Sequence, residues 1–207
     1  ASSAQAKPAF VAMVRAPAAA SRLRCHISVW SKPLWAAFRM LPTSENPSAS
    51  SRSDGAAPLV FDVSRLRELR GIRLDGDVLT IGAATTYLEM RRDPNVLERA
   101  PLLERMARDV GAVQIQARGT LGGNLATASP AADGVAALAA FDAVLVVRST
   151  RGTRRIPFPE LQTGYKSSTR EPDEVIVAVE LLVPPAGAPW FWRKVGTRRA
   201  QAISKVA

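Results

Sequence analysis

Arg118 to Asn124 is the stretch of the sequence whose residue types and spacing best fit a chemical role. It reads Arg-Gly-Thr-Leu-Gly-Gly-Asn, so three glycines fall within five positions. Glycine lets the backbone approach a bulky anion and exposes N–H groups to it, while Thr120 and Asn124 add side-chain hydrogen bonds. The pattern suits a pyrophosphate, although it matches neither the Rossmann fingerprint nor the phosphate loop that ends in Gly-Lys-Ser/Thr. A simple tight turn is the competing interpretation.

The residues that follow add polar groups within reach of this segment. Thr127 and Ser129 carry hydroxyls, and Pro130 stiffens the chain before Asp133, a lone carboxylate where a helix of Ala, Val and Leu begins. Asp133 has two interpretations. It is either the N-cap of that helix, which needs no ligand, or an acceptor for hydrogen bonds from a ribose or an adenine.

The run from Gly119 to Asp133, Gly-Thr-Leu-Gly-Gly-Asn-Leu-Ala-Thr-Ala-Ser-Pro-Ala-Ala-Asp, resembles the FAD loop of the xanthine dehydrogenase and aerobic carbon monoxide dehydrogenase family, in its flavoprotein (medium) subunit. Similar stretches follow the family's order along the chain. They are Leu59 to Gly71, Ile81-Gly-Ala-Ala-Thr-Thr86, Gly164-Tyr165-Lys166, and Phe191 to Val206 with Lys194-Val-Gly. The resemblance implies an α+β fold of the vanillyl-alcohol oxidase-like (PCMH) type, with FAD between two subdomains.

The same resemblance implies a role for individual residues in binding FAD. The segment from Thr120 to Asn124 is expected to wrap the diphosphate, and Asp133 to hydrogen-bond the cofactor. Ile176 is expected to offer a backbone contact, and Lys194 to lie near the isoalloxazine. The complete expected set is Thr120, Leu121, Gly122, Gly123, Asn124, Thr127, Ser129, Asp133, Ile176 and Lys194.

The implied function is electron transfer within a molybdenum hydroxylase. Electrons pass from two-iron clusters of a small iron–sulfur subunit through FAD to NAD, quinone or oxygen, and the molybdopterin lies in a large subunit. No acid, base or nucleophile of this chain has to act in the cofactor's redox chemistry, and no metal site is expected. His26, the one histidine, lies outside the matched region.

The sequence departs from the family upstream of Leu59. The family carries an earlier glycine loop that supplies the other half of the diphosphate cradle, and Asp54-Gly55-Ala56-Ala57 is only a poor match to it. We therefore expect an unmatched head at 1–57, a partial FAD-binding domain at 58–185 and the beginning of the C-terminal flavoprotein domain at 186–207. A degenerate flavoprotein fragment without cofactor, acting only in assembly or not at all, is the alternative function.

The elements that must position these residues can be predicted from their patterns. Strands are expected at Leu59 to Val63, Ala143 to Arg148 and Val175 to Val183, and Asp75-Gly76-Asp77 predicts a hairpin turn. Thr86 can cap a helix that begins at Tyr87. Further expected elements are a helical turn from Ser64 to Leu69, helices from Val96 to Val110 and from Gly134 to Phe141, and a strand from Arg154 to Ile156.

Composition limits the remaining function classes. The formal charge is +10, yet six of the cations lie between Ala1 and Ser44, where no acidic residue occurs. Nucleic-acid binding is therefore not expected, although a basic binding module that uses this head is a third alternative. No apolar run approaches the ~20 residues of a membrane span. The single cysteine, Cys25, excludes an internal disulfide and fits a reducing compartment such as the cytoplasm.

Overall fold

The computed structural model describes residues 11–13, 39–40, 60–165, 167–197 and 202–206. Five of its strands form one antiparallel sheet in the order β4-β5-β10-β6-β7. These strands are β4 (Ile72–Asp75), β5 (Val78–Gly82), β6 (Val144–Ser149), β7 (Gly152–Pro157) and β10 (Val175–Leu182). The long strand β10 occupies the centre of the sheet and pairs with β5 on one side and β6 on the other.

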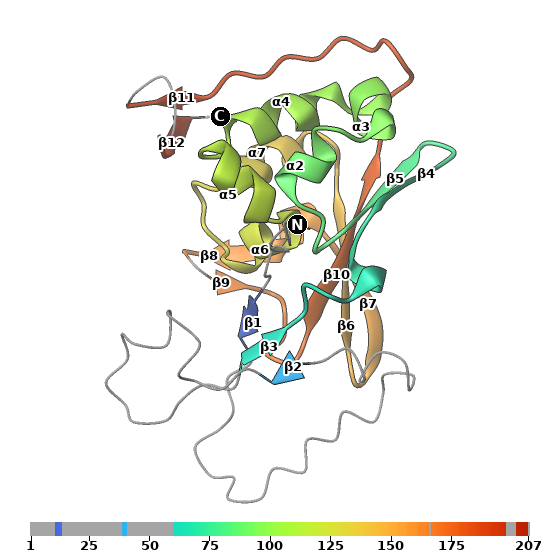
Figure 1. Ribbon diagram of the computed structural model, residues 1–207, viewed down its shortest axis with the longest axis vertical. Helices are drawn as coiled ribbons and strands as arrows, with labels where there is room; N and C mark the ends of the chain where they lie inside the picture. Colours follow the sequence, from blue (N-terminus) through green and yellow to red (C-terminus); the bar gives the residue numbers. More distant parts are fainter. Residues whose placement is uncertain (1–10, 14–38, 41–59, 166, 198–201, 207) are drawn as a thin grey trace, which may run out of the picture.

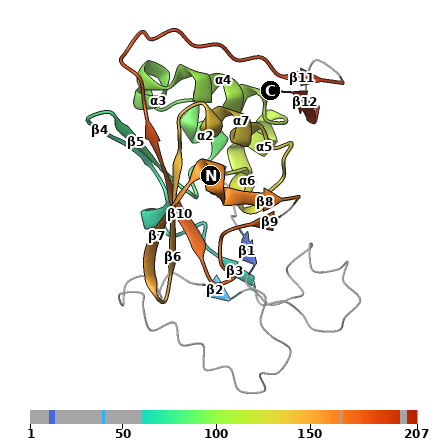
Figure 2. The ribbon, with the colours of Figure 1, turned by 180° about the vertical axis from the view of Figure 1, so that it is seen from behind.

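Short helices gather on one face of this sheet (Figures 1 and 2). They are α2 (Tyr87–Met90), α3 (Pro94–Arg99), α4 (Pro101–Asp109), α5 (Val113–Arg118), α6 (Leu121–Ala126), α7 (Asp133–Ala139) and α8 (Phe158–Leu161). A 3-10 turn, η3 (Arg67–Leu69), precedes β4. The alternation of hairpins with short helices gives the mixed α+β architecture predicted from the sequence.

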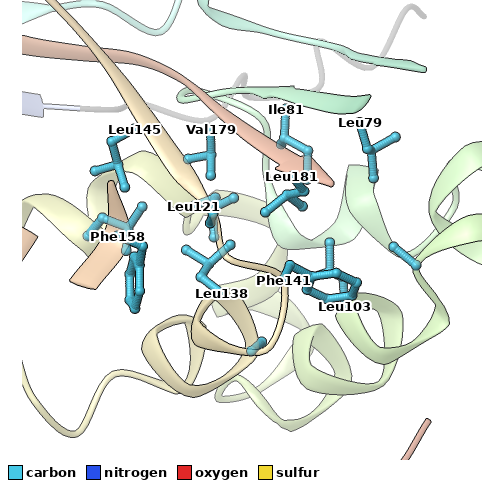
Figure 3. Close-up of a cluster of buried hydrophobic side chains, with 14 of the residues drawn as sticks. Leu79, Ile81, Leu103, Leu121, Leu138, Phe141, Leu145, Phe158, Val179 and Leu181 are labelled. Atoms are coloured by element: carbon cyan, nitrogen blue, oxygen red, sulfur yellow. The ribbon is translucent and has the colours of Figure 1, made fainter. Parts of the chain in front are cut away.

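The hydrophobic core lies between the sheet and these helices. Alternate residues along a strand point to one face, so Leu79 and Ile81 of β5 face the helices together. Figure 3 shows strand side chains meeting Leu121, Leu138 and Phe141 from the helical layer. Each fully buried large side chain contributes about 1.5–3 kcal/mol to this association. The core therefore fixes α6 and α7 against the sheet.

Three small sheets complete the described structure. The first has the order β1-β3-β2, and two two-stranded sheets pair β8 with β9 and β11 with β12. Their bounds are β1 (Val11–Met13), β2 (Arg39–Met40), β3 (Val60–Asp62), β8 (Gln162–Gly164), β9 (Ser167–Ser168), β11 (Val195–Gly196) and β12 (Ser204–Val206). Apart from β1 and β2, the expected head at 1–57 lies outside the described residues, as does Asp54-Gly55-Ala56-Ala57.

Most of the predicted local elements are confirmed. Asp75 pairs with Val78 across a two-residue turn, where Gly76 takes the positive φ of 57° that the hairpin requires. Thr86 caps α2 with a full capping box, because its side chain accepts from the Glu89 N–H while the Glu89 carboxylate accepts from the Thr86 N–H. The strand expected at Val175 to Val183 is β10.

One predicted helix is wrong. The pattern from Val96 to Val110 predicted a single helix, whereas the chain forms α3 and α4 with Ala100 between them at φ −139° and ψ 53°. The cause is Pro101. Its ring excludes the helical conformation at the preceding residue, and it has no N–H to continue the hydrogen-bond ladder. Among the described residues, no helix is long and apolar enough to cross a bilayer.

Candidate functional site

The glycine-rich segment is a short helix, not the open loop that its glycines predicted. Thr120 is the N-cap of α6, and its Oγ1 accepts from the Gly123 N–H at 3.1 Å. The Leu121 and Gly122 N–H groups donate to the Thr85 and Ala83 carbonyls at 3.3 and 3.0 Å, and the Asn124 N–H donates to the Thr120 carbonyl at 3.0 Å. The expectation that these N–H groups point outward is therefore wrong, because each already has a partner inside the chain.

Glycine is required at 122 for close packing. A Cβ there would lie 2.5 Å from the Ala83 Cβ and 2.7 Å from the Ala83 carbonyl oxygen, which is closer than real atoms come. Ala83 is held in turn by its N–H, which donates to the carbonyl of Val177 at a bulge in β10. The link between β5 and α2 thus clamps α6 onto the central strand.

Asp133 and Lys194, both expected at the cofactor, form a buried ion pair with each other. Lys194 Nζ lies 2.7 Å from Asp133 Oδ2, and the two side chains are only 10% and 11% exposed. Lys194 belongs to the C-terminal strap, defined here as residues 183–194, which runs from β10 past α3 and α4 to β11 (Figure 1). The residues are 61 positions apart, so the fold, not the sequence, creates this pair.

The strap is fastened where α4 ends and α7 begins. Lys194 Nζ also donates to the Asp109 carbonyl at 2.9 Å, and Trp192 Nε1 donates to the Asp109 carboxylate at 2.9 Å. A lysine at a helix C-terminus satisfies an unpaired carbonyl and opposes the negative end of the helix dipole. Lys194 therefore joins α4 and α7 through two different acceptors.

Burial raises the pKa of Asp133 above its ordinary value, and the negative charge of Asp109 adds to this. The ion pair with Lys194 opposes both effects without cancelling them. Asp133 is also not the N-cap of α7. Ala132 holds that position without a side-chain hydrogen bond, and Asp133 lies inside the first turn. The interpretation of Asp133 as a simple helix cap is therefore wrong.

Three buried polar atoms around this pair have no hydrogen-bond partner within the described structure. They are Asp133 Oδ1, Asn124 Oδ1 and the Tyr87 hydroxyl. Asn124 lies directly against α7, since a Cβ at Gly134 would lie 2.7 Å from its Oδ1. Buried polar atoms in folded proteins are nearly always paired, so unpaired acceptors on α6 and α7 fit a site that takes donors from a ligand or from water. FAD, whose ribityl, ribose and ring nitrogen atoms are polar, satisfies this requirement.

The remaining predicted residues lie around the same helices or on the sheet. Thr127 is exposed at the end of α6 and its Oγ1 donates to the Asn124 carbonyl at 2.7 Å, while Ser129 is half-buried after Ala128, which has a φ of 47°. Ile176 is buried on β10 opposite Val147. The structure thus gathers the predicted residues of α6, α7 and the strap, and places Ile176 on the strand that α6 packs against.

Two residues of the site were not predicted from the sequence. Tyr87 follows the helix cap Thr86 and is only 2% exposed, and Asp109 supplies both a carbonyl and a carboxylate to the strap. A tyrosine after a cap and an aspartate at a helix end are ordinary surface patterns. No signal in the sequence distinguishes them from such residues.

Comparison with known proteins identifies the domain. Residues 50–184 match the family described as FAD binding domain in molybdopterin dehydrogenase. The chain is 34% identical over 151 residues to the nicotinate dehydrogenase FAD-subunit of Eubacterium barkeri, which covers 72% of this chain and 51% of that protein. It is 32% identical to the carbon monoxide dehydrogenase medium chain of Hydrogenophaga pseudoflava, covering 66% and 47% of the two chains.

Solved structures show the same relationship. The carbon monoxide dehydrogenase structure from Hydrogenophaga pseudoflava aligns with a TM-score of 0.65 at 32% identity, over 68% of this chain and 48% of that one. Quinoline 2-oxidoreductase from Pseudomonas putida 86 aligns with a TM-score of 0.64 at 28% identity, over 68% and 49%. The chain thus spans about half the length of these relatives. The predicted family, fold class and FAD cofactor are confirmed, and the chain belongs to the family of FAD binding domains in molybdopterin dehydrogenases.

Proposed function

We propose that this chain is the FAD-binding part of an electron-transfer subunit of a molybdenum hydroxylase. In such a complex, electrons come from the two-iron clusters of a small partner subunit and leave to NAD, quinone or oxygen, while a large subunit holds the molybdopterin. The buried Asp133–Lys194 pair beside the glycine helix α6, with unpaired acceptors next to it, is the observation that carries this proposal. The reducing interior of a cell, the cytoplasm, is its proposed location.

The segment from Thr120 to Asn124 holds the diphosphate in this proposal. The N–H groups of 121–124 already have partners inside the chain. The segment therefore contributes mainly because its glycines have no side chains, which lets a ligand approach the backbone closely. The polar groups of Asn124, Thr127 and Ser129 supply hydrogen bonds at the same helix end. The glycines therefore contribute by leaving space beside the backbone, not by offering free N–H donors.

Asp133, Ile176 and Lys194 complete the proposed site. Lys194 places a positive charge where the resemblance puts the isoalloxazine. Asp133 offers the cofactor an acceptor oxygen, and Ile176 contributes its backbone. When bound, FAD supplies the one-electron and two-electron redox chemistry, and the protein tunes it through nearby charge and hydrogen bonds. Burial of both charged groups strengthens their effect, because the surroundings screen them less than water does.

Reconstitution with FAD tests this proposal. The full chain is incubated with excess FAD and passed over a gel-filtration column, and the flavin absorption that co-elutes with protein is measured. We expect a stoichiometric flavin complex. A chain that carries no flavin after this treatment contradicts the proposal and favours the degenerate fragment.

The placement of the glycine helix is tested by Gly123→Val. A valine side chain on α6 fills the space that close approach of the diphosphate needs, so we expect flavin retention to be lost. Gly164→Val is the matched control, because the nearest atom to a Cβ at Gly164 is 3.9 Å away. Equal retention in the Gly123 variant and the control would show that the diphosphate does not lie on α6.

A further inference from the structure

Asp109 holds the strap with two different groups, and the proposed function leaves its carboxylate unused. Asp109 Oδ2 accepts from Trp192 Nε1 at 2.9 Å, and the Asp109 carbonyl accepts from Lys194 Nζ at 2.9 Å. The residue is the last of α4, where the helix leaves carbonyl groups without internal partners. Its other carboxylate oxygen lies 3.8 Å from Nη2 of Arg105, an exposed side chain one turn earlier.

The residues around this contact alternate between the two sides of the strap. Trp192 and Lys194 lie partly buried, whereas their neighbours are exposed, namely Phe191, Arg193 and Val195. Successive side chains of an extended chain point to opposite sides, so a slip of one residue would turn Arg193 inward and Lys194 outward. A bond that fixes Trp192 therefore also fixes which side chain reaches α7.

The indole of Trp192 fits this position better than the neighbouring guanidinium does. Its ring packs against the hydrophobic core while its N–H meets the Asp109 carboxylate. An indole has one N–H donor, so a single acceptor satisfies it when it is buried. Arg193 has the charge to bind Asp109 but would bring five N–H donors against an apolar surface. The contact thus selects one register of the strap.

In this register the Lys194 ammonium has one N–H donor left. An ammonium has three donors, of which one binds Asp133 Oδ2 at 2.7 Å and another the Asp109 carbonyl at 2.9 Å. Among the described residues, no third acceptor is bonded to it. The side chain is only 10% exposed, so little water reaches it. The third donor is therefore available to a ligand of the candidate site.

We propose that Asp109 is a positioning residue for Lys194. Its carboxylate holds the Trp192 indole, and this contact fixes the register in which Lys194 reaches Asp133 and keeps its third donor for the cofactor. Asp109 itself touches no cofactor and acts only through the strap. The consequence for FAD rests on the proposed function, whereas the placement of Lys194 does not.

Titration of Asp133 in the full-length chain without FAD tests the placement, because this carboxyl group responds to both Lys194 and Asp109. The hydrogen bond and the charge of Lys194 lower the pKa of Asp133, and the negative charge of Asp109 raises it less strongly. Aspartate carboxyl carbons are labelled with carbon-13, and their NMR shifts are followed as pH is varied. Asp133→Asn identifies the Asp133 signal.

Two substitutions of Asp109 separate its hydrogen bond from its charge. Asp109→Asn keeps an oxygen that accepts from Trp192 and removes only the charge, so we expect the Asp133 midpoint to fall. Asp109→Leu also removes the acceptor, so Lys194 leaves Asp133 and we expect the midpoint to rise by about one pH unit. A general loss of structure would move the midpoint in the same direction in both variants.

Two further variants complete the test. Trp192→Phe keeps the charge of Asp109 but removes the N–H, so it should raise the Asp133 midpoint, and it gives this result even where Asp109→Leu does not fold. Arg105→Gln, the matched control on α4, removes the other partner of the Asp109 carboxylate and should leave the midpoint unchanged. A midpoint that falls or stays constant in Trp192→Phe, or that rises in Asp109→Asn, overturns the proposal.

Binding of FAD is measured separately on the same proteins. If wild type retains FAD, Asp109→Leu and Trp192→Phe should bind it about tenfold more weakly, whereas Asp109→Asn and Arg105→Gln should bind it as wild type does. Equal affinity in all of these proteins contradicts the positioning role. If the midpoints shift as expected but wild type binds no FAD, the proposed function fails and the role of Asp109 in placing Lys194 stands.

Discussion

Two buried carboxylates of this domain have opposite surroundings. Glu174, immediately before the central strand β10, accepts from both Arg154 Nε and Arg154 Nη2 and from the Glu171 N–H, so both of its oxygens are paired. Asp133, at the start of α7, pairs one oxygen with Lys194, and its other oxygen has no hydrogen-bond partner among the described residues. The side chains are 5% and 11% exposed, so burial alone does not separate them.

The difference appears in their ionisation. Hydrogen bonds from Arg154 lower the pKa of Glu174, whereas burial raises the pKa of Asp133 despite its lysine. A carboxylate whose hydrogen bonds are complete stabilises the fold and has little left to offer a ligand. One that is buried with a free oxygen is costly for the fold and available for function. The contrast between the two carboxylates therefore separates a structural ion pair from a candidate site.

The largest effect is expected when the Asp133–Lys194 pair is broken. Lys194→Met leaves a buried carboxylate without its cation and removes one of the two hydrogen bonds between the strap and Asp109, so we expect the free energy of unfolding to fall by about 3–5 kcal/mol. Chemical denaturation of the purified chain measures it. Arg155→Met is the matched control, because its pair with Glu180 lies at the surface and should contribute far less.

The double variant Asp133→Asn/Lys194→Met should recover part of this loss, because no unpaired charge remains. If Lys194→Met were as stable as Arg155→Met, the buried Asp133–Lys194 pair would contribute no more to stability than the exposed Arg155–Glu180 pair.

A smaller effect is expected at the contact between α6 and the end of β5. Gly122→Ala places a methyl group 2.5 Å from the Ala83 Cβ, and overpacking of this kind costs about 1–3 kcal/mol. Thermal unfolding measures this cost by comparison with Gly164→Ala, where the added Cβ is 3.9 Å from its nearest neighbour and φ is not positive. Equal melting temperatures for the two variants would mean that α6 is not clamped at Ala83.

Gly134→Ala should affect the ligand more than the fold. The added Cβ meets the end of the Asn124 side chain, which can rotate away, so the cost in stability is small. The displaced amide no longer presents its oxygen to the site, and we expect FAD to bind about tenfold more weakly. Titration of the variant and of Gly164→Ala with FAD makes the comparison. An unchanged affinity would remove Asn124 from the proposed site.

The smallest effect is the dependence of stability on pH, and its sign differs between the two carboxylates. The folded pKa of Asp133 is raised above 3.8, so its contribution is complete below that value and is lost as pH rises through the folded pKa. The folded pKa of Glu174 is lowered below 4.5, so its contribution is present above 4.5 and is lost as pH falls through the folded pKa.

Denaturation of wild type, Asp133→Asn and Glu174→Gln across the acidic and neutral range measures these slopes. The advantage of wild type over Asp133→Asn should shrink as pH rises, and its advantage over Glu174→Gln should shrink as pH falls. Each unit of pKa shift corresponds to about 1.4 kcal/mol. If both stability differences changed with pH in the same direction, the contrast between Asp133 and Glu174 would be contradicted.

Local patterns were sufficient to predict the elements whose causes are local. The hairpin at Gly76 and the cap at Thr86 depend on residues within a few positions of each other, and both formed as expected. Pro101 is also a local cause, and it separates α3 from α4 although the apolar spacing on both sides of it is typical of a single helix. At this position the steric effect of proline on the preceding residue outweighs the apolar pattern.

The candidate site was only partly predictable, because its partners come from distant positions. The glycines of α6 predict a diphosphate site with free N–H groups, whereas the structure shows that Gly122 packs closely on Ala83 and that the N–H groups have partners inside the chain. Lys194 and Asp133 were each predicted near the cofactor through the resemblance, while their mutual pairing arises only when the strap folds back over α4. Tyr87 carried no signal at all, since burial of its hydroxyl depends on the tertiary structure.

The attachment of the strap to Asp109 also gives the protein an intrinsic fluorescence probe. Trp192 donates its indole N–H to the Asp109 carboxylate, two residues before Lys194 donates to the carbonyl of the same aspartate. An indole that exchanges a carboxylate for water changes its environment, so its emission should shift whenever the strap lifts. The strap that joins α4 and α7 therefore carries a fluorophore, Trp192, at its point of attachment.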